Sequence, residues 1–262
     1  MLIQLKKSWK QFLSRRTLLK ELVVKGIKLK YRRSYLGVLW SLLEPILRTI
    51  VYTIVFGTLL GRGGPDYPLF ILCGRLLYSY FAASTKAATK SIGKNASLIR
   101  KVYVPKYLYP MSSVLSNYVT FLISLIVIIP LAIYGGVSFH LTAFGIIVPL
   151  IIILCMSYGV GLILATIGVF FRDIEYIWDV ALMVIMYTAA IFYDPSRLIK
   201  SGYGWLLELN PLYALIQNFR NCIFGEAMDS QLLLYSAGFS IVVLIVGHLL
   251  FYKQQDKFIL YI

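Results

Sequence analysis

The stretch Trp40–Gly57, WSLLEPILRTIVYTIVFG, decides the fold of this chain. Most of its residues are apolar or weakly polar. With its apolar flanks, it reaches the length of about 20 residues that crosses the hydrocarbon of a bilayer. Glu44, Pro45 and Arg48 interrupt it. Ionisable groups and prolines at membrane depth each cost free energy. The stretch therefore predicts a membrane helix whose polar groups need a partner or water.

Glu44 and Arg48 are four residues apart, so a helix places both on one face, where they can form an ion pair. Measured along the helix from Leu36, Glu44 lies at about 12 Å and Arg48 at about 18 Å, in the inner half of the bilayer. Pro45 is expected to bend the helix between them. Two roles stay open for this pair, a structural ion pair or a gate that lines a transport path.

The composition of the whole chain indicates a membrane protein. Of its 262 residues, 59% are apolar and 14% are charged, and the mean hydropathy is +0.78. Soluble domains average about 45–50% apolar and about 25% charged residues. We predict an all-α integral membrane protein, with an unusually apolar soluble protein as the weaker alternative. The net charge of +15 would indicate nucleic acid as the partner of a soluble protein. Here the basic residues follow membrane topology, so no nucleic acid is expected.

Six stretches are long and apolar enough to be spans, and the positive-inside rule sets their orientation. With these spans, twenty of the 26 basic residues fall on the side of both termini, and Arg48 and Arg75 lie within spans. Both termini are therefore predicted to be cytoplasmic. The four basic residues on the other side are Arg62, Arg197, Lys200 and Arg220. The predicted spans are Leu36–Leu60, Leu69–Ala88, Tyr107–Tyr134, Leu141–Phe171, Ile174–Tyr193 and Leu232–Tyr252.

The chain divides into a cytoplasmic N-terminal segment, residues 1–35, and a six-span transmembrane domain, residues 36–262. On a helical wheel, residues 18–33 separate an apolar half from a basic half. This pattern is typical of a helix that lies on an anionic membrane surface. A plain cluster of topogenic charges is the alternative. No long apolar stretch precedes a small-residue cleavage site, so a cleaved signal peptide is not expected.

The loop between the second and third spans predicts a short cytoplasmic helix over about residues 95–103. Asn95 can cap its start, and Pro105 ends it. An amphipathic helix between two spans needs a docking surface on lipid or on another protein. Its apolar stripe consists of Leu98, Ile99 and Val102.

The outer loop, residues 194–231, is too apolar to lie in water. Its run from Leu212 to Phe224 is too short to span a bilayer, and Asn210-Pro211 separates it from the apolar run before it. We predict a pair of short helices over about residues 195–224 that dip into the outer leaflet and return. A seventh span is the alternative, and it would put the termini on opposite sides.

The sequence lacks the motifs of an enzyme. It has no GxxxxGK[ST] loop, so the chain is not expected to hydrolyse ATP, and no Ser/His/Asp set or carboxylate pair converges by spacing. Three separated cysteines and two isolated histidines predict neither a disulfide framework nor a metal site. At the predicted cytoplasmic turn, Asp173, Glu175 and Asp179 are expected to pair with Arg172 or a basic partner rather than to hold a metal ion.

Aromatic residues inside the predicted spans are candidates for lining a path that conducts sugars. Aromatic residues make up 15% of the chain, with 20 tyrosines. Phenolic rings can stack on sugar rings and offer hydroxyls without fixing a charge. Ordinary packing within the membrane is the alternative for each of them. The candidates are Tyr52, Phe56, Tyr78, Phe81, Tyr187 and Phe192.

Four motifs together resemble a known family. They are YLGVLWSLLEPILRTIVYTIVFG (35–57), LIRKVYVPKYLYPMSSVLSNYVTFLISL (98–125), GVFFRDI (168–174) and LNPLYALIQNFRNCIFG (209–225). In this order and topology they are similar to the membrane subunit of polysaccharide ABC exporters. These are type-2 permeases that export O-antigen, capsular polysaccharide and teichoic acid. The resemblance runs from about Tyr31 to the C-terminus.

The resemblance implies a homodimer with two separate ABC ATPase subunits, which bind ATP and Mg²⁺ while this chain binds no cofactor. A lipid-linked polysaccharide would leave the cytoplasm through a tunnel between the two copies, in a bacterial inner or plasma membrane. The tunnel and gate candidates are Glu44, Arg48, the six aromatic residues, Asn210 and Pro211. The residues implied in coupling to the ATPase are Asn95, Leu98, Ile99, Arg100, Lys101, Val102, Tyr103, Arg172 and Asp173.

Two features depart from the family pattern. Arg75 stands where the family usually has an apolar residue, and FYDPSRL (192–198) is more charged than usual. Both lie towards the outer side and would suit a polyanionic substrate.

Three other functions compete with this interpretation. A type-2 ABC permease for a drug or small lipid is the nearest. A secondary transporter driven by an ion gradient is disfavoured because paired intramembrane carboxylates are scarce. A membrane scaffold without transport would tolerate loss of the aromatic candidates.

Overall fold

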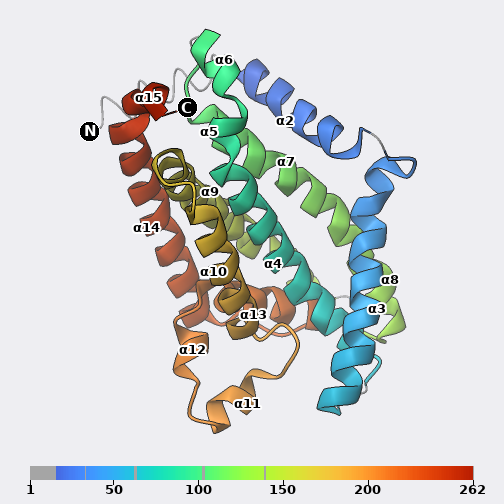
Figure 1. Cartoon of the computed structure of the whole chain (residues 1–262). Helices are drawn as coiled ribbons and strands as arrows, with labels where there is room; N and C mark the ends of the chain where they lie inside the picture. Colours follow the sequence, from blue (N-terminus) through green and yellow to red (C-terminus); the bar gives the residue numbers. More distant parts are fainter. Residues whose placement is uncertain (1–15, 33, 62–63, 102–103, 139, 262) are drawn as a thin grey trace.

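The computed structural model describes residues 16–32, 34–61, 64–101, 104–138 and 140–261 (Figure 1). Every regular element in these ranges is helical, as the sequence predicts. In chain order they are α2 (Arg16–Tyr31), η1 (Gly37–Leu39), α3 (Trp40–Leu60), α4 (Tyr67–Thr89), α5 (Ser91–Lys94), α6 (Ala96–Lys101), α7 (Leu108–Ser124), η2 (Leu125–Val127), α8 (Ile128–Tyr134), η3 (Leu141–Ile146), α9 (Ile147–Phe170), α10 (Ile174–Thr188), α11 (Pro195–Lys200), α12 (Trp205–Glu208), α13 (Pro211–Phe224), α14 (Ser230–Gln254), η4 (Gln255–Lys257) and α15 (Phe258–Tyr261).

In the described residues, four helical segments are long and apolar enough to cross a membrane. They are Gly37–Thr58, Leu108–Tyr134, Leu141–Phe170 and Ser230–Tyr261. They match the first, third, fourth and sixth predicted spans. The second predicted span is α4, which has 23 residues but carries tyrosines, serines and an arginine that make it less apolar. The fifth is α10, which has only 15 residues. That α4 and α10 also cross the membrane stays a prediction.

The helix α10 ends at Thr188, earlier than the predicted end at Tyr193. The chain turns inward directly afterwards, and Ala190 takes a positive φ of 46°, which is rare for a residue with a side chain. Residues 189–192 are buried in this turn. Their burial makes the turn that follows α10 part of the core.

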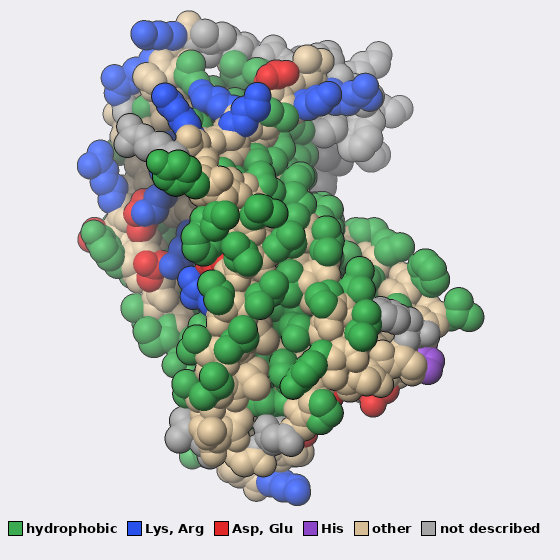
Figure 2. Space-filling view, turned by 90° about the vertical axis from the view of Figure 1, so that its right-hand side faces the viewer, with side chains coloured by type: hydrophobic (Ala, Val, Ile, Leu, Met, Phe, Trp, Pro, Cys, Tyr) green, Lys and Arg blue, Asp and Glu red, His purple; other side chains and the backbone are tan. Residues whose placement is uncertain are grey.

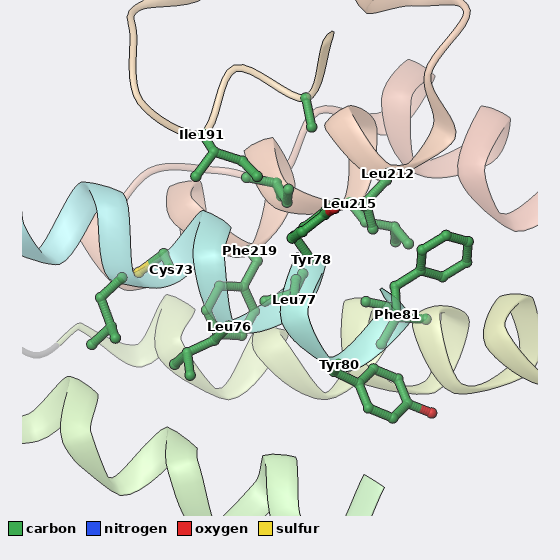
Figure 3. Packing of buried hydrophobic residues seen from close by; sticks show 14 of the residues in the cluster. Cys73, Leu76, Leu77, Tyr78, Tyr80, Phe81, Ile191, Leu212, Leu215 and Phe219 are labelled. Carbon is green, nitrogen blue, oxygen red and sulfur yellow. The ribbon is translucent and has the colours of Figure 1, made fainter. Parts of the chain in front are cut away.

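The helix α4 occupies the middle of the bundle (Figure 1) and packs against α3, α7, α9, α10 and α13. Figure 3 shows side chains of α4, among them Leu77 and Phe81, beside Leu212, Leu215 and Phe219 of α13. Its neighbours shield it, which explains how a less apolar helix can lie at the centre of a membrane protein.

Small residues let α9 and α14 pack closely. A Cβ placed on Gly159 would lie 2.6 Å from the backbone N of Leu244, and one on Gly247 would lie 2.5 Å from the carbonyl oxygen of Gly159. Because both obstacles are backbone atoms, neither can move aside easily. Close approach through small residues is a common way for membrane helices to associate.

The two ends of the bundle differ in their elements and charge. The helices α5, α6 and α15 lie at one end, and α11 and α12 lie at the other (Figure 1). On the face that Figure 2 shows, Lys and Arg gather towards the α6 end, and hydrophobic side chains cover the region below them. The helix α2 lies beside α7 and matches the predicted amphipathic helix at residues 18–33 within two residues.

Candidate functional site

Glu44 and Arg48 form the predicted ion pair on α3. Arg48 Nη2 lies 2.9 Å from Glu44 Oε1, and Arg48 Nε donates to the same oxygen at 2.9 Å. The side chains stay 50% exposed for Arg48 and 57% exposed for Glu44. The predicted pairing is thus confirmed.

Pro45 costs α3 one backbone hydrogen bond, and α7 replaces it. Proline has no N–H, so the carbonyl of Ser41, one turn earlier, loses its helical donor. Ser124 of α7 donates its hydroxyl to this carbonyl at 2.8 Å. Both serines are buried. Neighbouring serine hydroxyls are one of the means by which membrane helices tolerate proline. The proline thereby joins α3 to α7 beside the ion pair.

A cavity of about 320 Å³ lies beside the ion pair, between α2, α3, α4 and α7. Its charged lining residues are Glu44 and three basic residues, Lys30, Arg48 and Arg75. We call it the α3–α4 cavity. A second cavity of about 540 Å³ between α2 and α7 adjoins it, because both are lined by Lys30, Asn117 and Thr120. Together they form a polar groove from the α6 end into the bundle. The polar residues that α7 contributes to the second cavity are Ser112, Ser113, Ser116, Asn117 and Thr120.

Arg75 reaches the α3–α4 cavity without a carboxylate partner among the described residues. Its guanidinium carbon lies 5.4 Å from the ring centre of Tyr52 and 5.2 Å from that of Tyr78. Arg75 Nη1 lies 3.6 Å from Met186 Sδ. Its Nε is buried and finds no hydrogen-bond partner in the described ranges. The ring of Tyr52 on α3 and the thioether of Met186 on α10 hold the cation between these two helices.

The aromatic candidates separate into an open and a covered set. Tyr52 and Phe56 are half-buried, and Tyr187 is exposed. The covered residues are Tyr78 at 8% exposed, Phe81 at 4% and Phe192 at 3%. The side chains of the covered set are buried by other residues of this chain. They can therefore support the open set but do not themselves reach the surface.

The open and covered sets meet in one stack. Phe56 and Phe192 are parallel at 4.4 Å between ring centres, and Tyr52 lies 5.0 Å from Phe192. Tyr78 donates its hydroxyl to the carbonyl of Leu182 on α10 at 3.0 Å. The structure therefore gathers these predicted residues at the contact between α3, α4 and the outer end of α10. Phe81 instead packs edge-on against Trp178, at 6.2 Å.

The predicted cytoplasmic helix is present as α6, with the short α5 before it. Asn95, predicted to cap the start of this helix, donates its side-chain amide back to the carbonyl of Ser91 at 2.8 Å and so links α5 to α6. Ile99 is buried in a small core with Ile92, Phe251 and Phe258. This core joins α6 to the C-terminal end of the chain.

The other residues of the predicted coupling segment point outward or lie outside the described ranges. Leu98, Arg100 and Lys101 are exposed. Residues 102 and 103, which the prediction includes as Val102 and Tyr103, lie outside the described residues. The described part of this segment therefore has one buried residue, Ile99, and an exposed basic rim.

The acidic turn after α9 pairs with α4. Lys90 Nζ lies 2.7 Å from Glu175 Oε2, and Lys86 Nζ lies 2.8 Å from Asp179 Oδ1. The hydrogen bond that Lys90 donates to the Glu175 carboxylate raises the pKa of Lys90 above its ordinary value. The sequence leaves open whether Arg172 or another basic partner pairs with the acidic residues. In the structure, Lys90 and Lys86 pair with Glu175 and Asp179.

Arg172 and Asp173 stay exposed at the same turn. Arg172 lines a groove together with Lys90, Lys94 and Ala96, so the turn and the start of α6 share one surface. In the described part of the chain, His, Cys, Asp and Glu form no group of three that could hold a metal ion.

The outer segment folds as three short helices, α11, α12 and α13, where the sequence predicts a pair. Asn210 accepts a hydrogen bond from the first turn of α13, and Pro211 occupies the first position of that helix. The amide of Asn210 also donates to the carbonyl of Ile185 at 3.1 Å and to Thr188 Oγ1 at 2.9 Å. Asn210 thus connects α13 to the last turn of α10.

Arg220, counted from the sequence as an outer-side charge, is buried within α13 at 2% exposed. Its guanidinium donates to the carbonyls of Phe70, Ala190 and Ile191 at 3.0 to 3.2 Å. It also lies 3.5 Å from the centre of the Phe70 ring. Gly74 leaves room for it, because a Cβ there would lie 2.8 Å from Arg220 Nη2. One signal in the sequence could have revealed this burial. Arg220 follows the apolar residues Leu212 and Ile216 at intervals of four, which places all three on one face of α13.

The family described as "ABC-2 type transporter" matches residues 17–224 of the chain. The O-antigen export system permease protein RfbA of Klebsiella pneumoniae is 30% identical over 239 residues, covering 89% of this chain and 90% of that protein. The protein of the same name from Myxococcus xanthus is 28% identical over 249 residues, covering 93% and 94%. The polysialic acid transport protein KpsM of Escherichia coli is 24% identical over 246 residues, covering 90% and 92%. The similarity extends over nearly the whole length of each pair.

Proposed function

This chain belongs to the ABC-2 type transporter family, and we propose that it is the membrane subunit of an ATP-driven exporter for a lipid-linked polysaccharide. The observation that carries the proposal is its near full-length similarity to permeases named for O-antigen export and for polysialic acid transport. The polymer, an O-antigen, a capsular polysaccharide or a teichoic acid, would pass from the cytoplasm to the outer side of a bacterial inner or plasma membrane.

A separate ATPase subunit supplies the energy in this proposal, and ATP and Mg²⁺ bind there. The docking surface on this chain would consist of the exposed part of α6 together with Arg172 and Asp173, because Arg172 lines one groove with Ala96, the first residue of α6. Ile99 of α6 packs in one core with Leu162 of α9 and Phe251 of α14. A displacement of α6 would therefore be transmitted to both helices. The two ion pairs between α4 and α10 offer a second rigid connection into the spans.

The transport path lies between two copies of this chain in a homodimer. The face that carries α3 and α10 suits this role, since only 11% of the apolar window of α3 is buried within one chain, against 44% for the segment that contains α9. Glu44, Arg48, Tyr52, Phe56 and Tyr187 would line the path. The covered residues Tyr78, Phe81 and Phe192 would support that lining, and Asn210 and Pro211 would fix the outer gate helices.

The same proposal includes six crossings with both termini in the cytoplasm. The concentration of Lys and Arg towards the α6 end supports this orientation through the positive-inside rule. The helices α11 to α13 would then form the re-entrant segment in the outer leaflet.

The competing functions have less support. A permease for a drug or small lipid would share the family, but RfbA is named for O-antigen export and KpsM for polysialic acid transport. An ion-driven transporter would need intramembrane carboxylates free to bind protons or ions. Glu44, the carboxylate within the predicted first span, is engaged by Arg48.

Co-purification in mild detergent tests the proposal. The chain, tagged and expressed in its native host, is expected to retain a stoichiometric ABC ATPase, and deleting its gene should trap a lipid-linked polymer inside the cell. Recovery of the chain without any ATPase, together with normal polymer at the surface of the deletion strain, would show that the proposal is wrong.

A further inference from the structure

The α3–α4 cavity is unusual because a cation faces it deep in the bundle. Arg75 is the ninth residue of the 23-residue α4, so it lies about 12 Å from one end of that helix and about 21 Å from the other. An arginine keeps its charge in proteins. A charge at this depth is stable only with a counter-charge or water.

The charges around the cavity do not balance. Its lining holds Lys30, Arg48 and Arg75 against Glu44 alone. Both close contacts of Glu44 are with Arg48, at 2.9 Å. Arg75 contacts two ring faces and a thioether, and its buried Nε has no hydrogen-bond partner in the described ranges. Among the described residues, the cavity therefore presents more cationic donors than Glu44 satisfies.

The surroundings of Arg75 indicate what carries the anion. The aromatic residues that line the cavity with Arg75 are Tyr31, Tyr80 and Phe121, and Tyr52 connects the cation to a neighbouring aromatic stack with Phe56 and Phe192. Aromatic faces suit the apolar faces of sugar rings, and a guanidinium suits a carboxylate or phosphate, which it binds with two parallel hydrogen bonds. About 320 Å³ is at the lower end of the range of small-ligand sites, about 300 to 1,000 Å³. One charged sugar unit is therefore the appropriate size of ligand.

We propose that the α3–α4 cavity binds the anionic group of an acidic sugar unit, a carboxylate or a phosphodiester, as the polymer passes, with Arg75 as the residue that selects for charge. The inference rests on the proposed function and names its substrate class as acidic polymers. Arg48 shares its charge with Glu44 and would contribute at the mouth of the cavity, where both side chains are half-exposed.

The test compares two sugar probes of equal length on the complete transporter in lipid nanodiscs, this chain with its ATPase. Oligogalacturonate carries carboxylates, and its methyl ester has the same backbone without charge. We expect the acid to bind at least about tenfold more tightly than the ester. Arg75→Gln should remove this preference and leave binding of the ester unchanged. Arg75→Lys should keep part of the preference, because it keeps the charge but loses the fork of donors. Lys253→Gln, on the exposed end of α14, removes one charge away from the cavity and should change nothing.

Three results would overturn the inference. The first is a wild-type preference for the acid that survives in Arg75→Gln. The second is equal binding of acid and ester to the wild type. The third is that a short isoprenyl diphosphate without sugar displaces the acid, and that Arg75→Gln abolishes binding of this diphosphate. The anion that Arg75 binds would then belong to the lipid anchor. If Arg75→Gln does not assemble, Arg75→Met, which also removes the charge, takes its place, and a preference for the acid that survives in that variant overturns the inference. Failure of the complex to bind either sugar or to export polymer would instead refute the proposed function.

Discussion

At the scale of single residues, the polar groups inside the predicted spans are accommodated by three different means. Glu44 and Arg48 neutralise each other within one helix. Pro45 is compensated from outside, by Ser124 of α7 on the carbonyl of Ser41. Arg75 relies on aromatic faces and leaves donor capacity unused. The last of these is where ligand chemistry can enter.

The ion pair on α3 predicts a specific pattern in a double-mutant cycle. Glu44→Gln and Arg48→Gln alone each leave an unpaired charge in a membrane helix, whereas the double variant leaves none. We expect the double variant to export more polymer than would be predicted by adding the losses of the two single variants. In detergent, thermal unfolding should give a coupling energy of about 1 kcal/mol. Additive effects on both readouts would show that the residues act separately, and a direct role towards the substrate would gain support.

Arg220 is expected to be the most sensitive charged residue for stability. Arg220→Gln removes the charge and most of the donors that hold three buried carbonyls. Unsatisfied buried carbonyls should lower the free energy of unfolding by about 3 kcal/mol. Arg220→Lys should recover only part of this loss, because an ammonium group cannot reach the same carbonyls as a fork. Thermal shift of the purified protein measures it, with Lys200→Gln on exposed α11 as the control. Equal melting of the two glutamine variants would contradict the role of Arg220.

At the scale of whole elements, the helices are positioned by a few close contacts rather than by their own hydropathy. The helix α4 is less apolar than its neighbours and yet lies at the centre, because the helices packed around it shield it. The short α10 is held at both ends. Its inner end makes ion pairs with Lys86 and Lys90, and its outer end accepts hydrogen bonds from Asn210.

The contact between α9 and α14 predicts a difference between two glycines of one helix. Gly247→Val would push a side chain into the carbonyl of Gly159, whereas Gly238→Val on the same helix meets nothing within 4 Å. Because overpacking against backbone cannot relax by side-chain rotation, we expect Gly247→Val to destabilise the fold by about 3 kcal/mol. Gly238→Val should leave stability within about 0.5 kcal/mol of the wild type. Yield of monodisperse protein and melting temperature are the measurements, and similar behaviour of the two variants would disprove the tight contact.

At the scale of the whole molecule, the chain has the features of one part of a larger machine. The helix α3 leaves a wide apolar surface open, α6 presents an exposed basic rim, and a polar groove leads from the α6 end into the bundle. A second copy would face the first surface across the transport path, an ATPase would dock on the second, and an anionic group of the substrate would enter the third from that path.

This division of labour predicts where ATP is hydrolysed. The purified chain is expected to release no phosphate from ATP above the buffer background. Adding its ATPase should produce hydrolysis that is lost when the Walker lysine of that partner is mutated. Robust hydrolysis by a preparation of this chain that is free of any partner would contradict the assignment of catalysis to another subunit.

The sequence by itself determined the class of protein, the positions of most helices and the ion pair on α3. These features depend on composition and on spacings of a few residues, which a single helix converts directly into neighbours. It predicted the helix at α6 but not the hydrogen bond from Asn95 back to Ser91, because an asparagine side chain can bond in either direction along the chain. It also predicted two outer helices where three are present, because the one-turn α12 carries little local signal.

Only the tertiary structure decided which distant residues satisfy one another. Ser124 meets Ser41, Lys86 meets Asp179, and Arg220 meets the turn after α10 across 29 and 30 positions in the sequence. The same is true of Arg75, whose place between Tyr52 and Tyr78 on the wall of a cavity depends on the packing of α3 against α4. Such contacts leave no periodic pattern, because they arise when separate helices pack and each buried polar group takes the partner that this packing brings within reach.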